Sequence, residues 1–411
     1  MAEAAIIARV LASPLEVDAT AWNALLAQQS HPTPFMRHEY LAALHESQSA
    51  VPGTGWTPRF MTLWEGDALV AACPLYLKSH SYGEYVFDWA WASAYEQHGV
   101  PYYPKAVVAV PFTPVPGTRL MARNGDMRAL LVRALCQWCA DEGLSSLHVL
   151  FASDGDVQAS AQQGLMLRHQ VQFHWKNVAP TLATAGAALP PAGEGRPFTS
   201  FDDFLASLTQ EKRKKIRQER RRVAEAGVTF RWAQGADIAA PDWDFFYRCY
   251  ERTYLEHGNP PYLTRDFFAR MAQHMPQSWV LFVAERDGQS IASSLIAIGQ
   301  NKSMTGGQKD PESVAYGRYW GALERVDCLH FEACYYQPLQ WCIAHGMQRF
   351  EGGAQGEHKM ARALLPVQAT SAHWLAHPAF ADAVERFLER EGAGVEQYLG
   401  HLQARNPFRT A

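Results

Sequence analysis

The sequence predicts an α/β protein with two domains, each a mixed sheet flanked by helices. The main observation is a repeated order of elements, since each half reads as helix, hairpin, strand, helix, strand. In addition, 411 residues exceed one ordinary domain, and 48% hydrophobic with 19% charged residues is typical of a globular chain. We therefore expect an N-terminal domain over residues 1–178, an Ala/Gly/Pro-rich linker over 179–199 and a C-terminal domain over 200–411.

The elements of the first half follow from their residue patterns. Apolar and β-branched residues on both sides of Gly66 predict a hairpin, and Gly143 closes a helical apolar pattern. One later strand is interrupted by three prolines and a glycine. The expected elements are a hairpin over 60–81, a strand over 105–120, a helix over 127–142 and strands over 144–151 and 165–175.

The second half opens with a helix that begins at Ser200, with Asp203 at the capping-box position, and ends before Gly227. Its apolar stripe is wide in the first turns and thins to single residues in the basic part, which predicts a packed beginning and a charged remainder. The further expected elements are a hairpin over 278–300, a helix over 330–346 and a strand over 347–353.

The totals and missing motifs exclude several classes of protein. The chain lacks a stretch of roughly 20 apolar residues, and its beginning lacks the basic and apolar regions of a signal peptide. Cys136 and Cys139 lie inside a helical pattern, so we expect structural thiols in a reduced, cytoplasmic protein. Metalloprotease, paired C-x-x-C and serine-hydrolase motifs are absent, so we expect neither a metal site nor a serine nucleophile.

The segment EKRKKIRQERRRV, residues 211–223, carries eight Lys or Arg and two Glu, while the whole chain has a formal charge of −4. Arg213, Arg217 and Arg220 are spaced i, i+4 and i+7 and share one helix face. A row of guanidinium groups suits phosphate oxygens, so we expect these three residues to bind a phosphate-bearing substrate. A solvated charged face is the alternative.

The segment EGGAQGEHK, residues 351–359, combines glycines with ionisable groups after a predicted strand. Glycines let backbone N–H groups approach a ligand, and loops at strand ends often hold functional residues. The residues expected to move a proton are Glu351, Glu357 and His358, with Glu332 a weaker choice, and those expected to contact substrate are Gly352, Gly353, Gln355 and Lys359. The alternative is a tight turn with surface charges.

A further set of aromatic and polar residues has the composition of a small-molecule cleft. For the aromatic residues taken singly, core packing is the alternative, whereas Lys105 and Arg119 are costly to bury without a role. The candidate substrate-binding residues are Tyr82, Tyr102, Tyr103, Lys105, Thr113 and Arg119 in the first half and Tyr316 and Arg318 in the second.

Several long motifs resemble a known family. The stretch FDDFLASLTQEKRKKIRQERRRVAEAGVTFRW is similar to the segment that joins the two domains of the Fem family of aminoacyltransferases. The stretches PLYLKSHSYGEYVFDWAWASAYEQHGVPYYPK and FEGGAQGEHKMARALLPVQATSAHWLAHP resemble a bacterial Fem-related family labelled peptidoglycan biosynthesis or recognition. The resemblance covers nearly the whole chain and implies two tandem GNAT-like (acyl-CoA N-acyltransferase) domains.

The resemblance also implies an activity. An acyl or aminoacyl group would pass from an activated donor, acyl-CoA or aminoacyl-tRNA, to the amine of a small molecule or peptide. The donor would be a co-substrate, without a tightly bound cofactor, tRNA would be a possible partner, and the chain would be a monomer or homodimer. The alternatives are an acetyl-CoA-dependent N-acetyltransferase, which lacks here the usual glycine-rich pyrophosphate loop, and an inactive GNAT-fold protein that binds a phosphorylated or peptidoglycan-type ligand.

Overall fold

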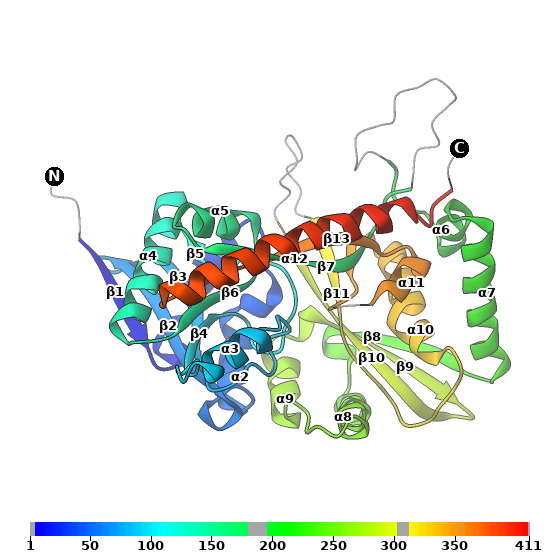
Figure 1. Cartoon of the computed structure of the whole chain (residues 1–411). Helices are drawn as coiled ribbons and strands as arrows, with labels where there is room; N and C mark the ends of the chain where they lie inside the picture. Colours follow the sequence, from blue (N-terminus) through cyan, green and yellow to red (C-terminus); the bar gives the residue numbers. More distant parts are fainter. Residues whose placement is uncertain (1–4, 180–194, 302–311, 355, 410–411) are drawn as a thin grey trace.

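The strands of the protein form one continuous mixed sheet in a computed structural model that describes residues 5–179, 195–301, 312–354 and 356–409 (Figure 1). Their order across the sheet is β1-β2-β3-β4-β6-β13-β7-β12-β11-β10-β9-β8, with β5 paired to β3. The strands of the first half are β1 (Ile6–Leu11), β2 (Trp56–Glu65), β3 (Ala68–Lys78), β4 (Lys105–Val108), β5 (Met121–Ala122), β6 (Ser146–Ala152) and β7 (Met166–Lys176). Those of the second half are β8 (Thr229–Gln234), β9 (Trp279–Arg286), β10 (Gln289–Asn301), β11 (Glu312–Ala322), β12 (Arg349–Glu351) and β13 (Leu365–Leu375).

The two halves repeat one pairing pattern. In the first, the hairpin β2–β3 is followed by β4, which is antiparallel to β3 and parallel to β6. In the second, the hairpin β9–β10 is followed by β11, which is antiparallel to β10 and parallel to β12. A helix lies between the strands of each parallel pair, as a parallel connection requires. The predicted mixed α/β class and its repeated element order are confirmed, but the halves share one continuous sheet instead of having a sheet each.

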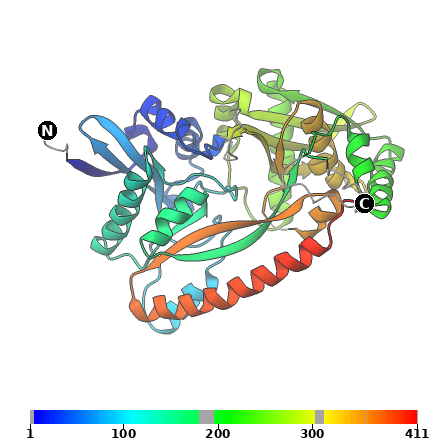
Figure 2. The same ribbon diagram turned by 90° about the horizontal axis from the view of Figure 1, so that it is seen from above.

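The halves exchange their last strands. β7 pairs with β12 of the second half, and β13 returns to pair with β6 and β7 of the first. The long helix α12 (Pro378–Ala404) runs beside β7 and β13 and spans both halves (Figure 2). The division of the chain at residues 178 and 200 stays a prediction, and most of the expected linker lies outside the described residues.

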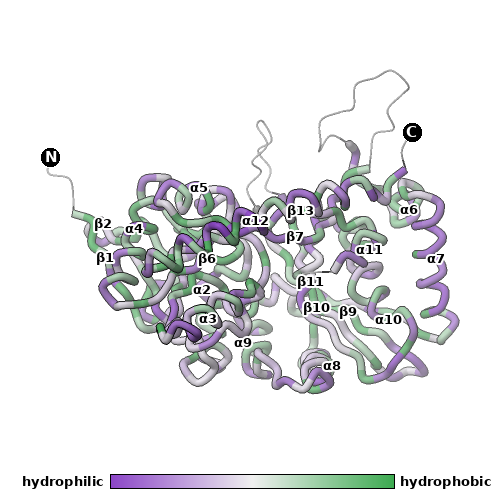
Figure 3. Tube along the Cα trace, viewed as in Figure 1, coloured by the Kyte–Doolittle hydropathy of each residue, from purple (hydrophilic) through white to green (hydrophobic). Residues whose placement is uncertain are grey.

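Helices cover both faces of the sheet, and the apolar segments gather between these layers (Figure 3). One face carries a core shared by both halves, where helices of the first half meet helices of the second. These helices are α1 (Ala19–Ala27), α2 (His38–Glu46), α8 (Ala240–Glu256) and α9 (Arg265–His274). The other face is covered by α4 (Gly125–Asp141) and α5 (Asp154–Gln162) in the first half, and by α6 (Phe201–Ser207), α7 (Gln210–Glu225), α10 (Leu329–Phe331) and α11 (Gln337–Ala344) in the second. A smaller core joins α3 (Trp89–Gln97) to α12.

Two predicted elements differ from the structure. The strand expected over 105–120 is regular only in β4, because the three prolines that follow cannot donate ladder hydrogen bonds. The helix expected from Ser200 to Ala226 is two helices, α6 and α7. Leu208 leaves the helix to pair with Phe408, and the N–H of Thr209 donates to the carbonyl of Pro407. The predicted cap is present, since the Ser200 hydroxyl accepts a hydrogen bond from the Asp203 N–H at 3.0 Å.

The helix predicted over 330–346 is continuous but irregular. It consists of α10, a π-helical turn (Glu332–Tyr336) and α11. A π turn inserts one residue per turn and rotates the side chains that follow it. Here the π turn contributes side chains to the walls of two cavities, Tyr335 to one and Glu332 to the other.

Candidate active site

The parallel strands β11 and β12 separate close to the middle of β11. Their pairing ends at Tyr316 and Glu351, after which β11 continues to Ala322 while the chain turns away at Gly352. On its other side β11 has a register shift, because Leu295 and Ile296 of β10 oppose Tyr319 and Gly317. Arg318 is therefore an extra residue without a counterpart on β10, a β-bulge that turns the strand.

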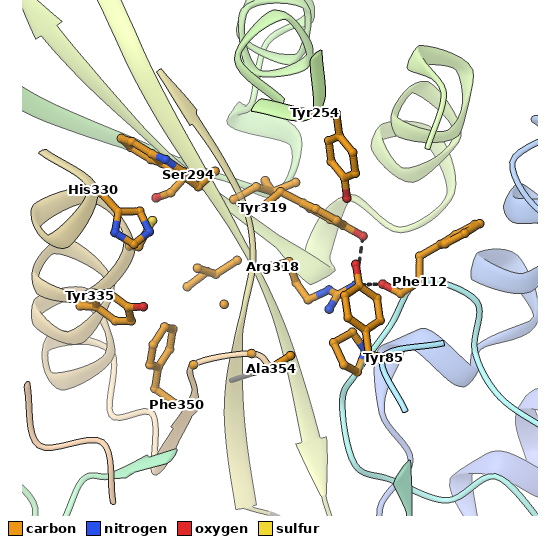
Figure 4. A pocket seen from close by; sticks show the side chains of 18 residues that line it. Tyr85, Phe112, Tyr254, Ser294, Arg318, Tyr319, His330, Tyr335, Phe350 and Ala354 are labelled. Carbon is orange, nitrogen blue, oxygen red and sulfur yellow. Dashed lines mark hydrogen bonds between the residues drawn. The ribbon is translucent and has the colours of Figure 1, made fainter. Parts of the chain in front are cut away.

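A cavity of about 240 Å³ lies at this separation, and we call it the inter-strand cavity (Figure 4). Its walls come from both faces of the sheet. The residues on the α10–α11 side are His330, Cys334, Tyr335 and Phe350, and those on the α8 side include Tyr85, Phe112, Tyr254 and Tyr319. The cavity therefore reaches both faces through the gap between the strands.

The glycines at the end of β12 leave no room for larger residues. A Cβ on Gly352 would lie 2.5 Å from the side chain of Leu364, and Gly353 has a φ of +78°. The buried Lys359 ammonium donates to the carbonyls of Gly353 at 3.2 Å and Ala354 at 2.5 Å, so it holds this loop in place. Burial lowers the pKa of Lys359 to about 8. Gln355 lies outside the described residues.

Arg318 joins the two halves at the cavity wall. Its guanidinium donates to the Phe112 carbonyl at 3.0 Å and the Thr113 hydroxyl at 3.3 Å, and it lies over the ring of Phe35. The predicted substrate contacts Arg318 and Thr113 are thus in contact, although their sequence separation is large. Tyr316 packs against Phe35 on the α8 side.

Two histidines stand on the other side of the cavity. His330 is part of its wall, and His358 is hydrogen-bonded at 3.1 Å to the hydroxyl of Tyr335, which is also part of the wall. Desolvation, His358, Arg362 and Lys359 lower the pKa of His330 to about 4. Burial and the charges of Arg362 and Lys359 also lower the pKa of His358. Both imidazoles are therefore neutral at pH 7 and can accept a proton.

The three predicted proton-transfer residues do not share one site. His358 adjoins the inter-strand cavity through Tyr335. Glu357 pairs instead with Arg405, the residue that follows α12, and accepts a hydrogen bond from the Tyr398 hydroxyl of that helix. The side chain of Glu351 faces a different cavity on the α8 side, because successive residues of β12 point to opposite faces of the sheet.

The basic helix α7 lies on the far side of the α10–α11 segment. Arg220 is already paired, since it donates to Glu332 at 3.1 Å, and it lies over the ring of Phe201. Glu332 is buried in this pair. Arg217 and Arg221 are exposed and, with Arg220, form the wall of a groove of about 500 Å³ that we call the arginine groove. Arg213 is placed outside it and reaches the carbonyl of Ala206 at 3.5 Å.

Glu219, also on α7, points inward. Its carboxylate accepts hydrogen bonds from Arg362 at 2.9 Å and from the hydroxyl of Tyr336. This buried pair fixes α7 against the π turn and against the segment that follows the glycine loop. The orientation of the arginine groove relative to the inter-strand cavity therefore depends on Glu219.

The other predicted substrate contacts of the first half lie away from the inter-strand cavity. Lys105 is fully buried, donating to Glu84 at 2.8 Å and to Asp88, and the Tyr102 hydroxyl donates to Asp88 at 2.6 Å. The Tyr103 hydroxyl bonds to Ser81. Tyr82 is exposed and packs against Trp89, and Arg119 is buried with a bond to the carbonyl of Val115.

Sequence reasoning missed most of the cavity wall. Tyr319 stands next to the predicted Arg318 in β11, a strand for which no residue range was predicted. Tyr85, Tyr254 and His330 come from three separate segments, and only the fold brings them together.

Within the described ranges, the structure contains no group of three or more His, Cys, Asp or Glu placed to hold a metal ion. No helix in the same ranges is long and apolar enough to cross a membrane.

Comparisons with known proteins agree with this architecture. The sequence profile of the FemAB-like family, described as peptidoglycan biosynthesis/recognition, matches residues 13–410. The crystal structure of FemX is similar at 9% identity and a TM-score of 0.52, with 92% of this chain and 100% of that chain covered. The C-terminal DUF2156 domain assigned to a lysylphosphatidylglycerol synthetase of Agrobacterium fabrum has 11% identity and a TM-score of 0.52, covering 92% and 97%.

A tandem GNAT protein from the clavulanic acid biosynthesis pathway is 13% identical with a TM-score of 0.41, covering 91% of this chain and 99% of that chain. No curated protein sequence matches the chain. The family match and the likeness to FemX confirm the predicted fold class of two tandem GNAT-like domains.

Proposed function

Because the chain belongs to the FemAB-like family, we propose that it transfers an acyl or aminoacyl group from an activated donor to an amine, and that the transfer takes place in the inter-strand cavity. The observation that carries this proposal is the gap between β11 and β12, which opens the cavity to both faces of the sheet. Two substrates can then enter from opposite faces and meet between the strands.

The backbone around the gap suits a reacting carbonyl group. Gly317, Gly352 and Gly353 are at the cavity wall without side chains that would keep a ligand away, and the Arg318 bulge interrupts the pairing with β10. Backbone N–H groups held in place before the reaction stabilise the oxyanion of a tetrahedral intermediate without reorganisation. The Gly352 N–H donates to the Phe173 carbonyl at 3.2 Å, so the donor would be another N–H group of this wall. The Arg318 guanidinium adds positive charge to the same wall.

The chemistry needs one proton acceptor. A protonated amine first loses one proton to the acceptor and then attacks the carbonyl carbon. As the tetrahedral intermediate collapses, the nitrogen loses a second proton and the departing thiolate or ribose oxygen takes one up, so the net release is one proton. The neutral imidazoles of His330 and His358 are the nearest candidates on the α10–α11 side, and Tyr335 connects His358 to the cavity. A covalent enzyme intermediate is not required.

The arginine groove is our candidate for the phosphate groups of the donor. Both acyl-CoA and aminoacyl-tRNA carry phosphates beyond the reacting carbonyl, and Arg217 and Arg221 present exposed guanidinium groups in the groove. The α10–α11 segment forms part of both walls, since His330 and Tyr335 face the cavity while Glu332 and Gln337 face the groove.

Thermal unfolding in the presence of acetyl-CoA, a longer acyl-CoA and a charged tRNA tests the proposal. We expect one donor class to raise the Tm and then to be consumed when an amine is added, and the class that does so identifies the enzyme. A donor that stabilises the protein without being consumed by any amine would indicate a binding protein. Stabilisation by none of them would contradict the proposal.

A further inference from the structure

A second cavity, of about 540 Å³, lies on the other side of β12. Phe350 points into the inter-strand cavity, whereas its neighbours Arg349 and Glu351 point into this one, which we call the carboxylate cavity. It lies where β6, β7, β12 and β13 meet, so the strand exchange between the halves creates it.

Glu351 has an open acceptor in this cavity. Its side chain is 4% exposed, and its Oε2 atom has no hydrogen-bond partner among the described residues. His174 Nε2 is 3.8 Å away, but that nitrogen is bonded to Gln172 Oε1 at 3.1 Å, and burial lowers the pKa of His174 well below its usual value. His174 is therefore neutral and does not compensate the charge of Glu351.

Arg349 has an open donor beside it. Its Nη2 atom lies 3.3 Å from both Glu312 and Glu351, so one guanidinium group is shared by two carboxylates. Its Nε–H has no hydrogen-bond partner among the described residues. A buried polar atom without a partner costs about 1–3 kcal/mol, so a ligand that pairs with both atoms would recover free energy.

We infer that the carboxylate cavity binds a ligand of the amino acid or peptide kind, with its ammonium group at Glu351 and a carboxylate or carbonyl oxygen at Arg349. The two residues are i and i+2 on one strand and share a face, and Arg349 Nη2 lies 3.3 Å from Glu351 Oε1. A short zwitterion can reach both groups, and the cavity volume lies within the range of small-molecule sites.

The charges around the two residues favour a ligand with both signs. Glu312 and Glu351 are opposed by Arg349 and by the buried Arg119, so charges of both signs lie beside each other here. At the cavity wall Lys176 and Asp154 oppose each other in charge, so neither a bare anion nor a bare cation is favoured throughout. The inference does not rest on the transfer reaction. The carboxylate cavity and the inter-strand cavity lie on opposite faces of β12 and have no wall residue in common.

Isothermal titration calorimetry with L-alanyl-L-alanine tests the inference. N-acetyl-L-alanyl-L-alanine lacks the ammonium group, and propylamine lacks the oxygen acceptors. We expect the dipeptide to bind in the millimolar range or tighter, and both analogues to bind at least tenfold more weakly. Equal binding of the dipeptide and its N-acetyl form, or no dipeptide binding at 10 mM (about −2.7 kcal/mol), would overturn the inference.

Variants locate the binding. Glu351→Gln keeps the size of the side chain and should weaken dipeptide binding at least tenfold, whereas Glu389→Gln, the same change on the exposed side of α12, should leave it unchanged. Lys176→Trp fills the cavity from an exposed position on β7, directly opposite Arg349 on the same face of the sheet. It should abolish binding with an unchanged Tm, which covers the case that Glu351→Gln does not fold. Ala354→Trp, in the inter-strand cavity, should leave dipeptide binding intact even if it abolishes donor binding. Wild-type affinity in both Glu351→Gln and Lys176→Trp would contradict the site.

Discussion

Tyr316 and Glu351 form the last pair between β11 and β12, and the two strands separate directly after them. The separation follows from the shortness of β12, whose three residues run into Gly352 and Gly353. Backbone groups, rather than a cluster of side chains, therefore form the centre of the proposed site. A substitution changes activity here mainly by moving this backbone or by filling the gap.

His358 and Glu357 should differ in their effects, although they are neighbours in sequence. We expect His358→Ala to lower kcat at least tenfold, because it removes the partner of Tyr335 at the cavity wall. Glu357→Ala should leave kcat within about twofold, because Glu357 pairs with Arg405, which follows α12. Both side chains are exposed, so each substitution should change the free energy of unfolding by about 0.5 kcal/mol or less and leave the Tm nearly unchanged. Equal activity of the two variants in single-turnover transfer would contradict this assignment.

The double variant Arg217→Glu and Arg221→Glu should weaken binding of the phosphate-bearing donor. Each lost charge-assisted contact is worth about 1.5 kcal/mol, so the Kd should rise about a hundredfold at low salt and less at high salt. The control Lys214→Glu and Lys215→Glu makes the same charge change at exposed positions of α7 outside the groove. A tRNA donor should give a steep dependence of log Kd on log salt, and a coenzyme a shallow one. If both double variants changed the donor Kd equally, the arginine groove would not be a specific phosphate site and α7 would be a solvated charged face.

Glu219→Ala should destabilise the protein strongly. It leaves the guanidinium of Arg362, which is 2% exposed, without its carboxylate partner. Breaking a buried pair in this way costs about 3–5 kcal/mol. Glu225→Ala, at an exposed position of the same helix, is the control and should be close to neutral. Denaturant unfolding of the two variants measures the difference, and similar midpoints would show that the buried pair contributes little.

The pH dependence of stability should report on Glu351. Burial raises its pKa to about 7, with Glu312 adding to the shift and Arg349 and Arg119 opposing it. The folded state therefore holds this proton more tightly than the unfolded state, whose carboxyl has a pKa near 4.5. The resulting stability is complete below pH 4.5 and is lost as the pH rises through about 7.

Glu351→Gln cannot titrate, so its stability relative to wild type should improve by up to about 3 kcal/mol between pH 4.5 and 7. Urea unfolding of both proteins across this range measures the effect. A constant difference between them would show that Glu351 is ionised throughout and that its environment is more polar than the structure indicates.

The local elements could be predicted from the sequence because their signals are local. Gly66 and Gly288 mark the two hairpins, Ser200 caps α6, and Gly227 follows α7. The break at Leu208 was missed because its cause is a contact with Phe408, two hundred residues later. The exchange of β7 and β13 was missed for a similar reason, since alternation shows that a segment is a strand but not which strand lies beside it.

The site was predictable only in part. The glycine loop and Arg318 were found because glycine runs, and charges among aromatic residues, are visible in the sequence. The separation of Glu351, Glu357 and His358 into three places follows from the alternation of β12 and from the 3-10 turn after Gly356. The alternation of β12 could have been predicted from the sequence, because Phe350 stands between Arg349 and Glu351. The partners Arg405 of Glu357 and Tyr335 of His358 are brought close only by the fold.

The central claim is that the inter-strand cavity holds the reacting end of an activated donor. The most direct measurement is the Kd of the stabilising donor for wild type, Ala354→Trp and Ala383→Trp. Ala354 is part of the cavity wall on a loop, and Ala383 is exposed on α12, so the indole blocks the cavity only in the first variant. We predict that Ala354→Trp weakens donor binding at least a hundredfold with an unchanged Tm, while Ala383→Trp binds as wild type does. Wild-type affinity in Ala354→Trp would contradict the claim.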